Sequence, residues 1–139
     1  MHFEADIDVD APAPQVFDTY ADVEHWPDWT ESVTSVERLD EGPLRVGSRA
    51  RIRQPRLPVA TWQVTELVPG ESFTWVARGP GIRTTGIHRV EQLGEGRSRA
   101  TAILEQAGPV GGLVGLLTKG LTERYLQTEV RGLKARCER

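Results

Sequence analysis

The sequence predicts an α+β fold in which a seven-stranded, curved antiparallel sheet grips a long C-terminal helix. Two short helices are expected between the first two strands, and an internal cavity between sheet and helix. Three observations support this. After Pro109 the chain contains no proline and is rich in helix formers. Short breaks containing glycine or proline separate six apolar segments, which is typical of hairpins. No helical pattern separates those segments, so an antiparallel meander is expected.

The N-terminal segment predicts one strand followed by two short helical elements. Residues 2–10 alternate apolar and polar side chains, which indicates a strand with one solvated face. Pro14 fits the first position of a helix, where its missing N–H costs nothing. Pro27, in the run Trp26-Pro27-Asp28-Trp29, should end or restart a helix. We expect one of these tryptophans to pack against the long helix and the other to lie near a cavity mouth.

Six further strands are expected, over residues 32–39, 47–54, 59–68, 72–78, 82–93 and 97–106. Their alternation assigns one face of each strand to the interior. The inward set comprises Ala50, Ile52, Gln54, Trp62, Val64, Phe73, Trp75, Ala77, Ile82, Thr84, Gly86, His88, Val90, Ala100, Ala102, Leu104 and Gln106. Arg49, Arg51 and Arg53 then lie outside, which favours a solvated convex face over an anion- or nucleic-acid-binding stripe. Glu105 also falls on the outer face, so it is not a candidate catalytic carboxylate.

The C-terminal segment carries two apolar faces that point nearly opposite ways on one helix. The first face comprises Leu113, Leu117, Leu121 and Tyr125, and the second Leu126, Val130, Leu133 and Cys137. Either the helix bends near Gly120 or its two halves contact different surfaces. We expect the first face to cover the cavity and the second to pack on a closed part of the sheet. A broken helix, with the glycines at 111, 112 and 115 in a loop, is the alternative.

Composition excludes several classes of function. The net charge of −3 and pI near 5.6 argue against nucleic-acid binding and against an anionic-membrane surface. No apolar run is long enough to span a membrane and no signal-peptide pattern occurs, so a cytoplasmic protein is expected. The histidines are scattered, and no phosphate-binding loop or nucleophile motif is present. The sequence therefore predicts no metal site and no cofactor, and the single cysteine, Cys137, is interpreted as core packing.

Several motifs carry a resemblance that covers essentially the whole chain. They are the opening strand followed by Ala-Pro-Ala-Pro-Gln-Val-Phe, then Trp26-Pro27-Asp28-Trp29, Gly47-Ser-Arg-Ala-Arg-Ile, Trp62-Gln-Val-Thr-Glu, Phe73-Thr-Trp75 and Leu133-Lys134-Ala135. With these motifs the sequence resembles the START-like helix-grip (SRPBCC) superfamily, and within it the polyketide cyclase/dehydrase-type proteins. The resemblance implies one START-like helix-grip domain over residues 1–139, with a deep, mostly apolar cavity under the long helix. It implies a fold rather than a reaction.

Strand facing and the first helical face together nominate the cavity residues. The candidate ligand-binding residues are Trp29, Gln54, Trp62, Trp75, His88, Leu104, Leu117, Leu121 and Tyr125. His88 and Tyr125 are also the candidate catalytic residues, since either could exchange protons or hydrogen-bond a ligand carbonyl. Each could instead be an ordinary core side chain. Burial of His88 should lower its pKa below about 6.5.

Three functions remain open from the sequence. The first is binding of a small hydrophobic or aromatic molecule, polyketide- or lipid-like, in the cavity. The second is a cofactor-independent polyketide cyclase or dehydratase, with His88 and Tyr125 or Gln54 moving protons. The third is a partner-binding protein whose cavity is closed by side chains. In each case we expect a monomer or homodimer, with no nucleic-acid partner and no stable membrane insertion.

Overall fold

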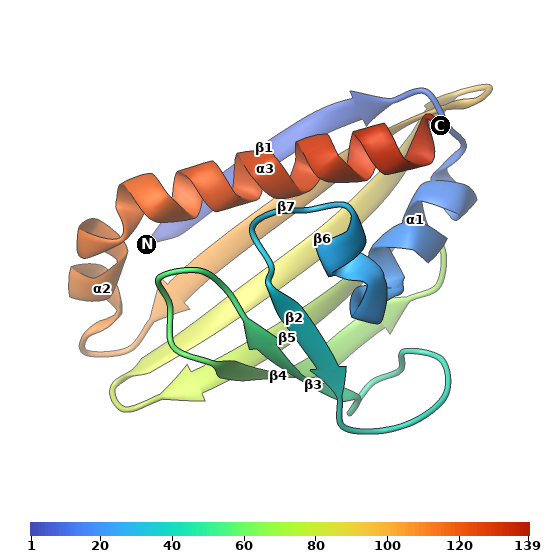
Figure 1. The fold of residues 1–139 in the computed structure, drawn as a ribbon. Coiled ribbons are helices and arrows are strands. Elements are labelled where there is room, and N and C mark those ends of the chain that lie inside the picture. Colours follow the sequence, from blue (N-terminus) through green and yellow to red (C-terminus); the bar gives the residue numbers. More distant parts are fainter.

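A computed structural model describes residues 1–139 and shows one seven-stranded, fully antiparallel sheet. Along the sheet the strands run in the order β1-β7-β6-β5-β4-β3-β2, so the first and last strands of the chain are neighbours. Their bounds are β1 (His2–Val9), β2 (Ser35–Arg38), β3 (Arg49–Arg53), β4 (Ala60–Val68), β5 (Ser72–Gly79), β6 (Ile82–Gly94) and β7 (Arg97–Ala107). The predicted fold class is confirmed, and Figure 1 shows the sheet curving beneath the C-terminal helix.

Four helices complete the fold. The first two, α1 (Ala13–Ala21) and the 3₁₀ helix η1 (Val23–Asp28), lie between β1 and β2 as expected. The other two, α2 (Gly111–Leu117) and α3 (Lys119–Cys137), follow β7. α1 begins one residue before Pro14, and the proline sits within its first turn, where its missing N–H leaves no hydrogen bond unmade. Figure 1 shows α3 lying along the sheet, with α1 near its C-terminal end and α2 at its other end.

The segment expected as one helix is divided at Thr118. This residue has φ −105° and ψ 8°, outside the helical range, and it lies two residues before Gly120. The Thr118 hydroxyl donates to the carbonyl of Val114 at 2.7 Å, a contact that bends helices. Backbone hydrogen bonds still pass through the junction, from Thr118 N to Val114 O and from Thr122 N to Thr118 O. The chain therefore changes direction without unwinding, and the glycines at 111, 112 and 115 are helical rather than part of a loop.

The second apolar face of the C-terminal helix packs on the closed side of the sheet, as expected. Leu126 and Val130 join Phe3, Ala5 and Ala102 in a small cluster between α3, β1 and β7. Leu133 and Cys137 belong to the main core with α1, η1 and the inner faces of the strands. Burial of this set removes a large apolar area from water and fixes the helix against the sheet.

The predicted strand facing is confirmed for the residues that form the core. Ala50, Ile52, Trp62, Val64, Phe73, Trp75, His88, Val90, Ala100 and Ala102 are all buried. Arg49, Arg51 and Arg53 are exposed on the opposite face of β3. Alternation along each strand is therefore a reliable guide here to what surrounds the space under α3.

Candidate functional site

An inner cavity of about 90 Å³ lies between α3 and the concave face of the sheet. Eleven of its sixteen lining residues are hydrophobic, as is usual for ligand cavities. The lining comes from η1, strands β3 to β7, the loops beside them and α3: Trp26, Val33, Ile52, Gln54, Leu57, Trp62, Trp75, Gly86, His88, Ala102, Ile103, Leu104, Thr122, Tyr125, Leu126 and Glu129. This volume has room for a single ring rather than for a long chain.

A wider outer pocket of about 550 Å³ adjoins the inner cavity. It lies between the β3–β4 loop, the ends of β5 and β6, and the junction of α2 with α3. Five residues line both spaces: Gln54, Leu57, Trp62, Leu104 and Thr122. The site is therefore a narrow inner end that is reached from a broad mouth, and the mouth has the size of a typical ligand pocket.

His88 points into the inner cavity from β6 and is held by Phe73, its neighbour on β5. The two rings stack with centroids 4.2 Å apart and planes 14° apart. Nδ1 of His88 lies 3.2 Å from the Phe73 carbonyl oxygen. Because a carbonyl only accepts, Nδ1 carries the proton, and Nε2 remains an acceptor without a protein partner. Burial lowers the pKa of His88 to about 3, in the expected direction, so the ring is neutral at pH 7.

Glu129 on α3 is a buried carboxyl group that the sequence analysis missed. It lines the inner cavity, and its side chain accepts a hydrogen bond from the Tyr20 hydroxyl at 2.5 Å. Burial raises the pKa of Glu129 to about 7, although the hydrogen bond from Tyr20 acts in the opposite direction. Burial, and then the nearby carboxylate, raise the pKa of Tyr20. A signal was present: Glu129 lies three residues after Leu126 and four before Leu133, on the buried face of the helix.

Aromatic rings surround His88 on several sides. The ring centroids of Tyr20, Trp26 and Trp75 lie 5.1, 5.4 and 5.3 Å from that of His88. Trp26 is fixed by its indole N–H, which donates to the backbone carbonyl of Tyr20 at 2.8 Å. Trp62 extends the group, with its centroid 5.6 Å from that of Trp75. These flat walls suit a flat apolar ligand, because aromatic rings pack favourably face to edge or offset.

Six of the nine predicted site residues line the inner cavity: Gln54, Trp62, Trp75, His88, Leu104 and Tyr125. Two of them also donate hydrogen bonds to backbone carbonyls in loops. Gln54 donates from Nε2 to the Ser32 carbonyl at 3.1 Å, and the Tyr125 hydroxyl donates to the Pro55 carbonyl. The Tyr125 hydroxyl is therefore already hydrogen-bonded within the protein. His88 and Glu129 are the polar cavity groups that can still hydrogen-bond a ligand.

Three predicted site residues lie elsewhere, which corrects the expected cavity face of the helix. Leu117 is 76% exposed, because α2 ends there and its direction changes at Thr118. Leu121 is half-buried and does not line the cavity, although the next residue, Thr122, does. Trp29 is buried under α3 and packs closely against it: a Cβ added to Gly132 would lie only 2.0 Å from the Trp29 carbonyl oxygen. Of the tryptophan pair, Trp26 lines the cavity and Trp29 packs against the long helix.

The antiparallel sheet, the long helix lying on it and the space between them define a helix-grip domain with a mostly apolar, partly aromatic cavity. Residues 1–138 match the family described as polyketide cyclase / dehydrase and lipid transport, and the chain belongs to that family. Membership implies binding of a hydrophobic ligand or polyketide cyclase activity. No curated protein matches the sequence.

Solved structures show the same fold at low sequence identity. The Zhui aromatase/cyclase from Streptomyces sp. R1128 is 20% identical, with a TM-score of 0.81 over 100% of this chain and 94% of that one. A START superfamily protein from Mycobacterium smegmatis is 18% identical, with a TM-score of 0.77 over 99% and 97%. A protein from Helicobacter pylori is 15% identical, with a TM-score of 0.83 over 99% and 88%. At these identities the likeness shows the fold alone.

Proposed function

We propose that the protein binds a small hydrophobic molecule whose one end is a flat ring carrying a hydroxyl group. The ring would occupy the inner cavity among Trp26, Trp62 and Trp75, and the remainder of the molecule the outer pocket. The observation that carries the proposal is the contact between His88 Nδ1 and the Phe73 carbonyl oxygen. The Nδ1 proton is committed to the Phe73 carbonyl, so Nε2 offers the cavity an acceptor, which a hydroxyl satisfies and a carbonyl does not.

Binding calorimetry with three matched probes tests this proposal: 2-naphthol, 2-methoxynaphthalene and naphthalene. We expect one-to-one binding, with 2-naphthol bound about 3- to 10-fold more tightly than its methyl ether, the range of one net hydrogen bond. His88→Phe keeps the flat ring but removes the acceptor, so it should abolish that preference while retaining naphthalene. Arg51→Ala, on the exposed face of β3, is the control. Equal affinities for naphthol and ether would contradict the hydroxyl assignment.

The same titration separates ligand binding from a partner-binding role with a closed cavity. If the side chains around the inner cavity do not admit a ligand, none of the three probes will bind with defined stoichiometry. Trp75→Ala and Trp62→Ala should weaken binding more than Arg51→Ala, because both tryptophans line the cavity. Equal effects from all three substitutions would remove the cavity from the proposal.

A cofactor-independent cyclase or dehydratase is the second candidate, favoured by the buried Glu129. A histidine with a pKa of about 3 is a poor base at neutral pH, whereas a carboxyl group with a pKa of about 7 can both give and take a proton there. In this role Glu129, rather than His88 or Tyr125, would exchange protons with the substrate. Glu129→Gln should then retain binding of a poly-β-ketone substrate and lose about 10²- to 10⁴-fold in rate. Absence of turnover by the unaltered protein would leave ligand binding as its activity.

A further inference from the structure

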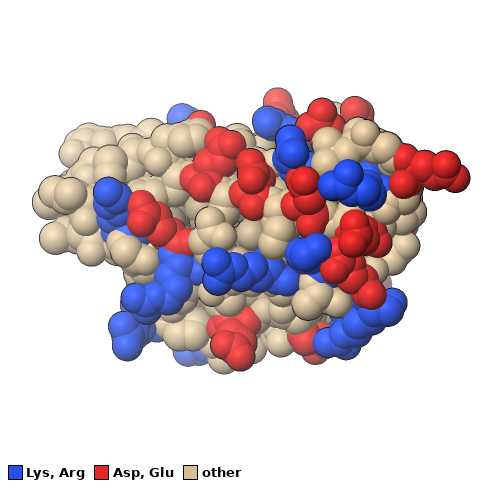
Figure 2. Space-filling model, turned by 90° about the horizontal axis from the view of Figure 1, so that it is seen from above, with Lys and Arg blue, Asp and Glu red and all other residues tan.

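The end of the molecule that carries α2 exposes an unusual amount of apolar surface. Leu113, Leu116 and Leu117, all within one seven-residue helix, are 59%, 65% and 76% exposed. The other side of the same helix faces inward, where Val114 lines the outer pocket and Gly115 packs on Met1. In Figure 2 this end of the molecule is free of charged side chains at its tip. Such a concentration of exposed leucines beside a pocket indicates an interaction surface.

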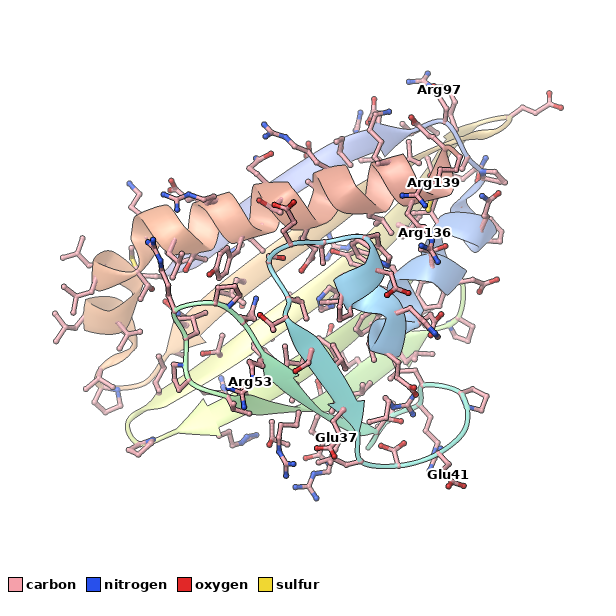
Figure 3. All side chains as sticks on the ribbon, viewed as in Figure 1. Glu37, Glu41, Arg53, Arg97, Arg136 and Arg139 are labelled. Carbon is pink, nitrogen blue, oxygen red and sulfur yellow. The ribbon has the colours of Figure 1, made fainter.

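The segments around this tip are basic, although the protein as a whole is acidic. Segments 53–61, 76–86 and 106–122 supply most of the residues that line the outer pocket, and they contain no aspartate or glutamate. They contain five cations, all exposed and none in an ion pair: Arg53, Arg56, Arg78, Arg83 and Lys119. At the opposite end, labelled by Arg97 in Figure 3, Arg97 instead pairs with Asp8 and Asp10. Arg78 lines the outer pocket, and the other four cations are each next in sequence to a residue that lines it. We call the three α2 leucines and these five cations the mouth face.

We propose that the mouth face docks on the surface of a lipid bilayer that contains anionic lipids. Leucines inserted among the headgroups gain the hydrophobic effect, and arginine or lysine beside them gains from the negative surface potential. The outer pocket is lined by Arg78 and by Val114 of α2, so docking of this end brings the pocket beside the bilayer, from which an apolar ligand can pass without crossing water. None of the helices combines the length and the hydropathy of a bilayer-spanning segment. The docking proposed is peripheral, and it holds whichever ligand the cavity takes.

The charge of the mouth face favours an anionic bilayer over a second copy of the chain as its partner. A second copy of the chain would place five unpaired cations against five others in a symmetric interface, and like charges facing each other disfavour association. An anionic bilayer attracts unpaired cations and accepts protruding leucines without a groove of matching shape. The net charge of −3, which argued against a membrane surface, is an average over the chain, whereas binding depends on the charge of the face presented.

Vesicle co-sedimentation of the full chain tests the proposal. We expect binding to phosphatidylcholine vesicles that contain 30% phosphatidylserine, at least tenfold weaker binding to pure phosphatidylcholine, and weakening at high salt. Leu116→Asn combined with Leu117→Asn should reduce affinity about tenfold or more. Val46→Asn is the matched control, since Val46 is 60% exposed but lies in the β2–β3 loop, outside the mouth face. Arg78→Glu combined with Arg83→Glu should also abolish binding, while Arg89→Glu should not.

Three results would overturn the proposal. The first is no sedimentation with the phosphatidylserine vesicles. The second is an equal loss of binding in the Val46 and leucine variants, which would show that the leucines have no special part. The third is a dimer, detected by analytical ultracentrifugation, that the leucine variant converts to a monomer, because the face would then belong to a second copy. Circular dichroism of each variant verifies that the fold is retained, as expected for exposed positions.

Discussion

Leucine side chains are buried at one end of the C-terminal helical segment and exposed at the other. Leu133, near the end of α3, is fully buried between the sheet and α1, whereas Leu117, at the end of α2, is 76% exposed. Both positions belong to apolar faces at helical spacing in the sequence, Leu117 with Leu113 and Leu121, and Leu133 with Val130 and Cys137. The comparison shows that helical periodicity identifies which residues share a face, but not whether anything lies opposite that face. At the α3 end the sheet and α1 supply a partner, and at the α2 end no part of this chain covers the leucines.

The sharpest way to test this contrast is to truncate one leucine at each end. Leu133→Ala removes three heavy atoms from a filled core and should destabilise the protein by about 2–5 kcal/mol. Leu117→Ala should change the free energy of unfolding by less than about 0.5 kcal/mol, because the side chain is mostly in water. Urea denaturation of both variants measures the difference. Comparable losses would mean that α2 is packed in solution and that the mouth face is not free.

Glu129 lies between the two ends, and its buried carboxyl group makes stability depend on pH. Its pKa is about 7 in the folded protein against 4.5 ordinarily, so the folded state holds the proton more tightly. Stability is therefore full below pH 4.5 and falls as the pH rises towards 7, by roughly 3 kcal/mol for this group alone. Glu129→Gln keeps an acceptor for the Tyr20 hydroxyl and removes the titration. Its stability relative to the unaltered protein should rise by that amount between about pH 4.5 and 8.

Denaturation curves at several pH values measure this effect. His88 gives stability a pH dependence of the opposite sign. Its pKa is about 3 in the folded protein against 6.5 ordinarily, so it destabilises the folded state as the pH falls below 6.5. Comparing Glu129→Gln with the unaltered protein cancels the contribution of His88, which both contain. Glu123→Gln, an exposed change on the same helix, is the matched control. If the two glutamine variants follow the same course with pH, the burial of Glu129 does not persist in solution.

Alanine substitutions at two glycines of α3 should change the free energy of unfolding least, and in opposite directions. A Cβ on Gly132 would lie 2.0 Å from the Trp29 carbonyl oxygen, whereas a Cβ on Gly120 would meet nothing within 4 Å. Gly132→Ala should therefore destabilise the protein by about 1–3 kcal/mol, despite the better helix propensity of alanine. Gly120→Ala should stabilise it by up to about 1 kcal/mol. Thermal denaturation measures both, and a gain in stability from Gly132→Ala would contradict the close approach of α3 to the Trp29 segment.

The parts of the fold that could be predicted depend on short-range patterns. Alternation placed Trp62, Trp75 and His88 on the inner face, because the side-chain period of a strand is fixed. The break at Thr118 could not be predicted in place, since a threonine hydroxyl bonded to the preceding turn has no distinct sequence signature. Glu129 was missed because the tyrosine that stabilises it lies 109 residues away in the chain. Partners so distant are set by tertiary packing, which a local pattern does not contain.

The clustering of all four tryptophans at one place gives the protein an optical reporter of its own. Trp29, Trp26, Trp75 and Trp62 form a continuous series, with successive ring centroids 5.7, 5.3 and 5.6 Å apart. Over such short separations excitation energy passes readily between indole rings, so the four emit as one group. A ligand entering the inner cavity touches three of them and alters the emission of the whole set. The leucines of α2 lie outside this group, so the fluorescence of the unlabelled protein distinguishes a filled cavity from an occupied surface.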